Sequence, residues 1–182
     1  VTEESGIKLG STYAVGMVFL DRADEARQSK ARATLAAELE ALNLSVAGWR
    51  VVPVDPDQAC GKQALANYPL VEQVFVNCGP DQSEEEFNVS LFVARRKTEL
   101  ALESEDPVFY ISSLSTSVVS YKGLVMPANL PVFYLDLQDE RLESSLCVFH
   151  QRFSTNTLPQ WRLAQPFRYP VSYTHLRAHE TK

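Results

Sequence analysis

The sequence predicts a mixed α and β fold, built as a single domain, from two observations. Segments rich in β-branched and aromatic residues alternate along the chain with segments rich in strong helix formers. No internal repeat or low-complexity stretch interrupts this alternation. A chain of 182 residues is also long enough to bury a hydrophobic core without disulfide or metal staples.

A strand followed by a helix is predicted near the start of the chain. Residues 11–20, STYAVGMVFL, are mostly apolar β-formers, and Asp21 begins a charged stretch. Strong helix formers dominate residues 23–42, and Asn43 marks the end of this helix. One face of the helix is apolar and should pack on a sheet, with Leu35, Leu39 and Leu42 at helical spacing.

Two further strands are predicted, separated by a loop. Residues 45–54, SVAGWRVVPV, have the composition of a strand, which Pro53 either ends or places at a sheet edge. Residues 56–69 are expected to be loop with one helical turn. Residues 70–78, LVEQVFVNC, form the third predicted strand, which the sequence GPDQ ends.

The second long helix has an amino-terminal signature at Ser83. Glu86 follows three residues later, and this spacing matches a capping box. A helix over residues 84–103 is predicted from a repeat at helical spacing, made of Phe87, Leu91, Ala94, Thr98 and Leu102.

Shorter elements are predicted for the following stretch of the chain. Residues 108–114 and 117–121 are rich in β-formers and indicate a pair of strands joined by small hydroxyl residues. Residues 126–145 contain two prolines and short apolar pieces, which indicate short helical turns over the sheet. Residues 146–149, LCVF, form an apolar run that is typical of a buried strand.

The charge of the chain argues against nucleic acid or an anionic membrane as a partner. The formal net charge is −6 and the isoelectric point is near 5.1, whereas phosphate recognition depends on clustered lysine and arginine. No run approaches the roughly 20 apolar residues of a membrane span, and the first ten residues are unlike a signal peptide. The composition therefore predicts a cytoplasmic protein.

The cysteines and histidines predict neither a disulfide framework nor a metal site. Cys60, Cys78 and Cys147 are odd in number and widely separated, so they are expected to be small buried thiols. His175 and His179 have the spacing of two ligands on one helix face, but the sequence offers no third ligand.

A group of polar side chains follows the apolar run 146–149, in the stretch HQRFSTNTLPQWRLAQPFR. Arg152 offers a planar fork of donors that matches a carboxylate, and Ser154, Thr155 and Asn156 donate or accept hydrogen bonds. Such a site would suit an amino-acid substrate. The same residue types also serve in surface ion pairs, turns and helix caps, so the pattern alone leaves both interpretations open.

Three blocks of the sequence resemble the amino-terminal class II glutamine amidotransferase domain of the glutamate synthase family. They are FYISSLS, YKGLVMPANLPVFYLDLQDERLES and, most specifically, HQRFSTNTLPQWRLAQPFR; YAVGMVFL and GWRVVPV resemble the family in the same order. The resemblance implies an α+β fold with four layers, αββα, that of the amino-terminal nucleophile hydrolases, here incomplete at both ends. It also implies hydrolysis of glutamine to glutamate and ammonia.

The resemblance also implies roles for individual residues. Arg152 matches the arginine that holds the α-carboxylate of glutamine, Thr155 matches the threonine beside it, and Ser154 lines the same turn. The nucleophile of the family is a processed amino-terminal cysteine whose free amine acts as general base. None of the three internal cysteines occupies that place, so the chain alone is expected to contain no catalytic residue and to be inactive.

Residues 1–168 are therefore expected to be an internal part of the amidotransferase domain. Residues 169–182 replace the family's oxyanion-hole motif with an unlike sequence, and they are expected to be a non-native or unpacked tail. Two other functions stay open: a noncatalytic glutamine-binding regulatory module, and a class II amidotransferase that serves another acceptor.

For a full-length protein, the resemblance implies that ammonia is transferred to 2-oxoglutarate in a separate synthase domain. That domain uses FMN and an iron–sulfur cluster, with electrons from ferredoxin or from a small subunit that oxidises NADPH. None of the residues that bind these groups is expected in this chain. The compartment would be the cytoplasm, or the plastid stroma in a plant or alga.

Overall fold

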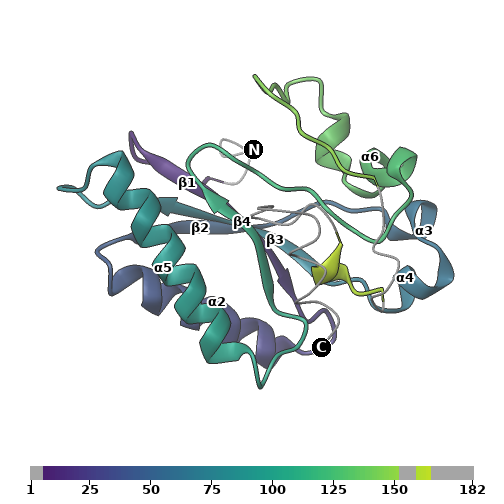
Figure 1. The fold of residues 1–182 in the computed structure, drawn as a ribbon, viewed down its shortest axis with the longest axis horizontal. Helices are drawn as coiled ribbons and strands as arrows, with labels where there is room; N and C mark the ends of the chain where they lie inside the picture. Colours follow the sequence, from purple (N-terminus) through teal and green to yellow (C-terminus); the bar gives the residue numbers. More distant parts are fainter. Residues whose placement is uncertain (1–5, 152–158, 165–182) are drawn as a thin grey trace, which may run out of the picture. The chain divides into compact units, whose positions relative to one another are not determined.

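The computed structural model describes residues 6–151 and 159–164, which belong to two compact units. The first unit comprises Val1–Val52 and Pro69–Ser120, and the second comprises Pro53–Tyr68 and Tyr121–Lys182. Figure 1 follows the elements of both units along the chain. Within the part of the chain that is described, no helix has the length and apolar character needed to cross a bilayer.

The first unit is built on a four-stranded antiparallel sheet (Figure 1). β1 pairs with β3 over its whole length, from Tyr13 opposite Asn77 to Leu20 opposite Leu70. Four predicted strands are thereby confirmed, and β2 lies at an edge of the sheet with Pro53 beyond its end. The strand order is β2-β3-β1-β4, with bounds β1 Tyr13–Leu20, β2 Ser45–Val51, β3 Leu70–Asn77 and β4 Tyr110–Ser115.

Both predicted long helices are confirmed as α2 (Glu25–Glu40) and α5 (Glu84–Leu102), and they cover one face of the sheet (Figure 1). The side chain of Asp24 caps α2 by accepting a hydrogen bond from the backbone N–H of Arg27 at 3.0 Å. Asn43 follows the helix in the left-handed conformation, with φ of 60°.

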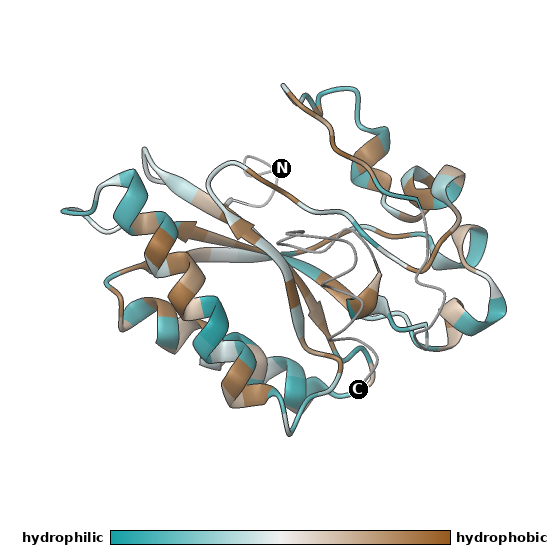
Figure 2. Ribbon diagram, in the orientation of Figure 1, coloured by the Kyte–Doolittle hydropathy of each residue, from teal (hydrophilic) through white to brown (hydrophobic). Residues whose placement is uncertain are grey.

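The hydrophobic core of the first unit lies between these helices and the sheet. Figure 2 shows hydrophobic residues on the strands and on parts of both helices. The sheet and the helices on its face confirm a mixed α+β fold. The core includes Ala14, Val18, Leu35, Leu39, Val74, Val76, Phe87, Leu91, Ala94 and Ile111.

The predicted capping box at the start of α5 is confirmed. The Ser83 hydroxyl accepts a hydrogen bond from the Glu86 backbone N–H at 3.3 Å, and Glu86 Oε2 accepts one from the Ser83 N–H at 2.9 Å. These bonds from Ser83 to the ionised carboxylate hold the pKa of Glu86 below its ordinary value. The apolar face predicted for this helix is also confirmed, since all five of its residues are buried.

A bidentate ion pair ties α2 to the sheet. Arg32 Nε lies 2.8 Å from Glu72 Oε2, and Arg32 Nη2 lies 2.6 Å from Glu72 Oε1. The hydrogen bond to the largely buried Glu72 raises the pKa of Arg32. Glu72 is shielded from water. Removal of either Arg32 or Glu72 is therefore expected to lower the free energy of unfolding.

The strand predicted over residues 117–121 is wrong. Val118 and Val119 are exposed, and β4 ends at Ser115. The Ser113 hydroxyl accepts a hydrogen bond from the Ser120 N–H at 3.0 Å, and the Ser112 hydroxyl donates to the Ser120 carbonyl at 3.1 Å. Serine side chains thus satisfy the backbone groups that a strand ladder would otherwise pair.

The described part of the second unit is built mainly from short helical elements. The loop predicted over residues 56–69 contains two helices rather than one turn, and the helical turns predicted within residues 126–145 are confirmed. Val54 and Tyr134 form an isolated antiparallel bridge. The elements are α3 (Pro56–Ala59), α4 (Lys62–Ala66), η1 (Pro127–Asn129), α6 (Leu130–Phe133), η2 (Leu135–Gln138) and η3 (Trp161–Leu163).

The buried strand predicted over residues 146–149 is also wrong. Leu146, Val148 and Phe149 are 75%, 79% and 81% exposed, and within the described residues the run pairs with no strand. An apolar run indicates that burial would be favourable, but it does not supply the partner strand that burial requires.

Truncation of a buried leucine in α5 should destabilise the fold far more than truncation of an exposed one. We expect Leu91→Ala to lower the free energy of unfolding by about 2–5 kcal/mol, because it removes buried methyl groups and leaves a cavity. Leu100→Ala, in the same helix but exposed, should change it by less than about 0.5 kcal/mol. Urea unfolding followed by circular dichroism measures both; equal losses would contradict the assigned faces of α5.

Loss of the Ser83 cap should destabilise the chain and change its acid response. We expect Ser83→Ala to lower the free energy of unfolding at pH 7 by about 1 kcal/mol, whereas Ser29→Ala, exposed within α2, should not lower it. The pKa of Glu86 is lower in the folded chain than in the unfolded chain. The ionised carboxylate therefore contributes fully to the stability of the fold above the unfolded pKa of about 4.3, and this contribution is lost as the pH falls through the folded pKa.

Glu86→Gln should therefore lose less stability than the wild type on acidification below about pH 4. Denaturant titrations at a series of pH values measure this difference. Parallel curves for the two proteins would show that the Ser83 hydrogen bonds do not favour the ionised carboxylate.

Candidate functional site

The substrate-binding residues predicted from the sequence lie outside the described residues, but both flanks of their segment are described. Residues 146–151 precede it and residues 159–164 follow it. The structure therefore does not test whether the polar side chains come together. The predicted residues outside the description are Arg152, Ser154, Thr155 and Asn156, together with His175 and His179.

The downstream flank is packed into the second unit through Trp161. The indole is buried, and its Nε1–H donates a hydrogen bond to the Ala64 carbonyl in α4 at 3.3 Å. Its ring lies 5.1 Å from the ring of Phe133, measured between centroids. The upstream flank differs, because Leu146, Val148 and Phe149 are exposed. Of the two described flanks, the downstream one is therefore packed and the upstream one is exposed.

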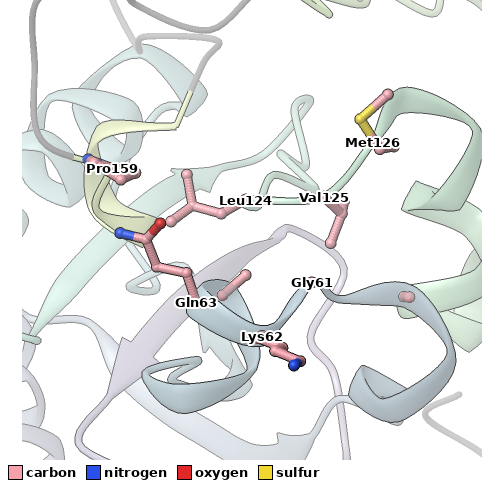
Figure 3. A pocket seen from close by; sticks show the side chains of 9 residues that line it. Gly61, Lys62, Gln63, Leu124, Val125, Met126 and Pro159 are labelled. Atoms are coloured by element: carbon pink, nitrogen blue, oxygen red, sulfur yellow. The ribbon is translucent and has the colours of Figure 1, made fainter.

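A pocket of about 370 Å³ opens in the second unit, with Pro159 of the downstream flank in its wall (Figure 3). Leu124, Val125 and Pro159 line it with aliphatic surface, and Lys62 and Gln63 contribute polar groups. Among the described residues this lining is mostly apolar and contains no arginine, so what is described of it suits an apolar group. Sequence reasoning missed this pocket, since its walls come from segments about sixty residues apart.

The three cysteines do not share the buried environment predicted for them. Cys147 is exposed, whereas Cys60 and Cys78 are half-buried. Burial, with a smaller contribution from Asp57, raises the pKa of the Cys60 thiol. An activated thiol needs the opposite shift, so Cys60 is a poor nucleophile. Cys78 Sγ donates to the Gln82 carbonyl at 3.7 Å.

Metal coordination has no candidate in the part of the chain that the structure covers. Residues 6–151 and 159–164 contain no group of three or more histidine, cysteine, aspartate or glutamate side chains placed to hold an ion. The acidic side chains with the clearest roles act in helix caps and ion pairs, as Glu86 and Glu72 do.

The different environments of the cysteines predict different rates of modification. We expect Cys147 to react with a disulfide reagent such as DTNB at about the rate of a free thiol at pH 8. Cys60 should react more slowly, because burial and a raised pKa reduce both its access and its thiolate fraction. Cys147→Ser should remove the fast phase measured at 412 nm, while Cys60→Ser should leave it intact. A fast phase that survives Cys147→Ser would overturn this assignment.

Comparison with known proteins agrees with the family resemblance of the sequence blocks over most of the chain. The family described as class II glutamine amidotransferases matches residues 1–174. The NADPH glutamate synthase large chain of Azospirillum brasilense is 43% identical over 156 residues, which is 85% of this chain. Ferredoxin-dependent glutamate synthase 2 of Synechocystis is 42% identical over 159 residues, or 87% of this chain.

A ferredoxin-dependent glutamate synthase of Arabidopsis thaliana, named as chloroplastic/mitochondrial, is 40% identical over 157 residues. The aligned region covers 10% of each of these three relatives, so the chain spans about a tenth of their length. The family match extends over nearly the whole chain and agrees with the blocks that resemble glutamate synthases. The chain belongs to the class II glutamine amidotransferases.

Proposed function

We propose that this chain is the glutamine-binding part of a glutamate synthase amidotransferase domain, which hydrolyses glutamine to glutamate and ammonia. The observation that carries the proposal is the stretch of residues 150–168, HQRFSTNTLPQWRLAQPFR, within a class II amidotransferase match over residues 1–174. The similar proteins are named as glutamate synthases of both electron-donor types, which favours this function over an amidotransferase with another acceptor.

In this proposal the side chains of Arg152, Ser154 and Thr155 hold the amino-acid end of glutamine. The Arg152 guanidinium donates two parallel hydrogen bonds to the α-carboxylate, and the hydroxyls of Ser154 and Thr155 make further hydrogen bonds to the substrate. This fixes the substrate by its invariant end and leaves the side-chain amide free for attack.

The nucleophile in the proposed reaction is not one of the three cysteines of this chain. All three are internal and therefore lack a free α-amine, and the raised pKa of Cys60 disfavours its thiolate. The chain by itself is accordingly expected to bind glutamine without hydrolysing it.

In the full-length protein, ammonia from this domain would be transferred to 2-oxoglutarate. FMN and an iron–sulfur cluster would supply redox chemistry there, with ferredoxin or an NADPH-oxidising small subunit as electron donor. The described residues do not fit such a cluster: Cys78 lies in the first unit, Cys60 and Cys147 lie in the second, and no three ligands gather. These groups would therefore be bound by other parts of the protein, in the cytoplasm or in a plastid.

Replacement of Arg152 tests the proposal directly. In a full-length synthase that carries this domain, we expect Arg152→Ala to lower glutamine-dependent kcat/KM by tens to thousands of fold. Truncation of one side of such a pair costs about 2–5 kcal/mol, and about 1.4 kcal/mol is a factor of ten. Arg152→Lys should restore little, because an ammonium cannot reproduce the planar fork.

Glutamate synthesis from added ammonia should survive in both Arg152 variants, since that route bypasses glutamine. Arg96→Ala, an exposed arginine in α5, is the matched control and should retain both activities. If the two activities fell together, or if neither fell, Arg152 would be a structural residue and the proposed substrate site would be wrong.

A further inference from the structure

Lys122 is a lysine buried in the second unit, with only 2% of its surface exposed. Its ammonium donates a hydrogen bond to the Arg162 carbonyl at 2.9 Å, and its own carbonyl accepts one from the Tyr134 hydroxyl at 2.8 Å. A buried ammonium is costly unless hydrogen bonds replace its water. The hydrogen bond to Arg162 replaces part of that hydration and reaches the backbone of η3.

The same piece of backbone is held from a second side by Trp161. Its indole donates to the Ala64 carbonyl and packs on Phe133, which in turn lies 4.7 Å from the ring of Tyr134 in an edge-to-face arrangement. Gly123, the neighbour of Lys122, makes room for the indole: a Cβ at this position would lie 2.6 Å from Trp161 Cζ3. Lys122 thus bonds to the backbone of η3, and Gly123 leaves space for the Trp161 side chain of the same element.

These contacts hold residues 159–164, which follow the proposed glutamine-binding residues Arg152, Ser154 and Thr155 in the sequence. Trp161 follows Thr155 by six residues in the sequence, with Pro159 and Gln160 directly before it. On the upstream side, Leu146, Val148 and Phe149 are exposed, so the comparable anchor lies on the downstream side.

We propose that Lys122 and Trp161 are positioning residues for glutamine binding, through their hold on residues 159–164. The inference rests on the proposed function, because Arg152 acquires its role there. A guanidinium fork must meet a carboxylate within a few tenths of an ångström and a few degrees, so an anchor at Trp161, nine residues after Arg152, affects affinity through the backbone. Lys122 and Trp161 touch no reacting atom in this role.

The test compares Lys122→Met and Trp161→Phe with the wild type in a full-length synthase that carries this domain. Lys122→Met keeps the length of the side chain but removes the donor to Arg162. Trp161→Phe keeps an aromatic ring but removes the donor to Ala64. We expect the KM for glutamine to rise about tenfold or more in Lys122→Met, and less in Trp161→Phe, while ammonia-dependent synthesis is unchanged.

Two controls separate positioning from general destabilisation. Lys97→Met removes an exposed lysine of α5 and should leave the KM for glutamine unchanged. Leu91→Ala lowers stability through the first unit, so it too should keep a wild-type KM below its melting temperature. In the 182-residue chain, hydrogen exchange of residues 159–164 should be faster in Lys122→Met than in Leu91→Ala at equal distance from the melting temperature.

The outcomes distinguish this inference from the function on which it rests. A wild-type KM in both Lys122→Met and Trp161→Phe, with glutamine use lost in Arg152→Ala, would overturn the inference and leave the proposed function intact. If Lys122→Met did not fold, a wild-type KM in Trp161→Phe would overturn it alone. A parallel loss of glutamine- and ammonia-dependent rates would show a structural role only. Unchanged glutamine use in Arg152→Ala would instead remove the proposed function.

Discussion

The first unit depends on β1, which lies with β3 at the centre of the sheet and, like β3, is hydrogen-bonded along both of its edges. β3 pairs with one edge over all eight residues, and β4 pairs with the other. At Gly16 the neighbouring side chains come so close that an added Cβ would lie 2.6 Å from Val74 and 2.9 Å from Leu114. The pairing of β1 with both neighbours therefore relates the registers of the three strands, and its residues Ala14, Val18 and Leu20 belong to the core that α2 and α5 complete.

The second unit is stabilised in a different way. Apart from the bridge between Val54 and Tyr134, its described elements are short helices that cannot persist alone. Buried aromatic rings and side-chain bonds to backbone carbonyls hold them together, with Tyr134 and Trp161 among the donors. Burial raises the pKa of the Tyr134 hydroxyl well above its ordinary value, so it remains a neutral donor at any physiological pH. These side-chain bonds replace the strand ladder that holds the first unit together.

The proposed site illustrates the limits of local reasoning about function. Residue types alone allowed Arg152 to be a carboxylate clamp or an ordinary surface residue, and only the resemblance of the whole stretch favoured the clamp. Nothing in the local sequence marked Lys122, which looks like any exposed lysine between Tyr121 and Gly123. Lys122 is buried through tertiary contacts: its ammonium bonds to the carbonyl of Arg162, and the neighbouring Trp161 bonds to the carbonyl of Ala64.

The sequence by itself determined the elements whose signals are local. The capping box of Ser83 and Glu86 and the apolar faces of both long helices follow from spacings within a few residues, and the four sheet strands follow from local composition. Only the tertiary structure decided whether an apolar run is buried. Residues 117–121 and 146–149 have strand composition, but a strand also needs a partner that is distant in sequence. Burial is a property of the folded chain, and composition reports only its tendency.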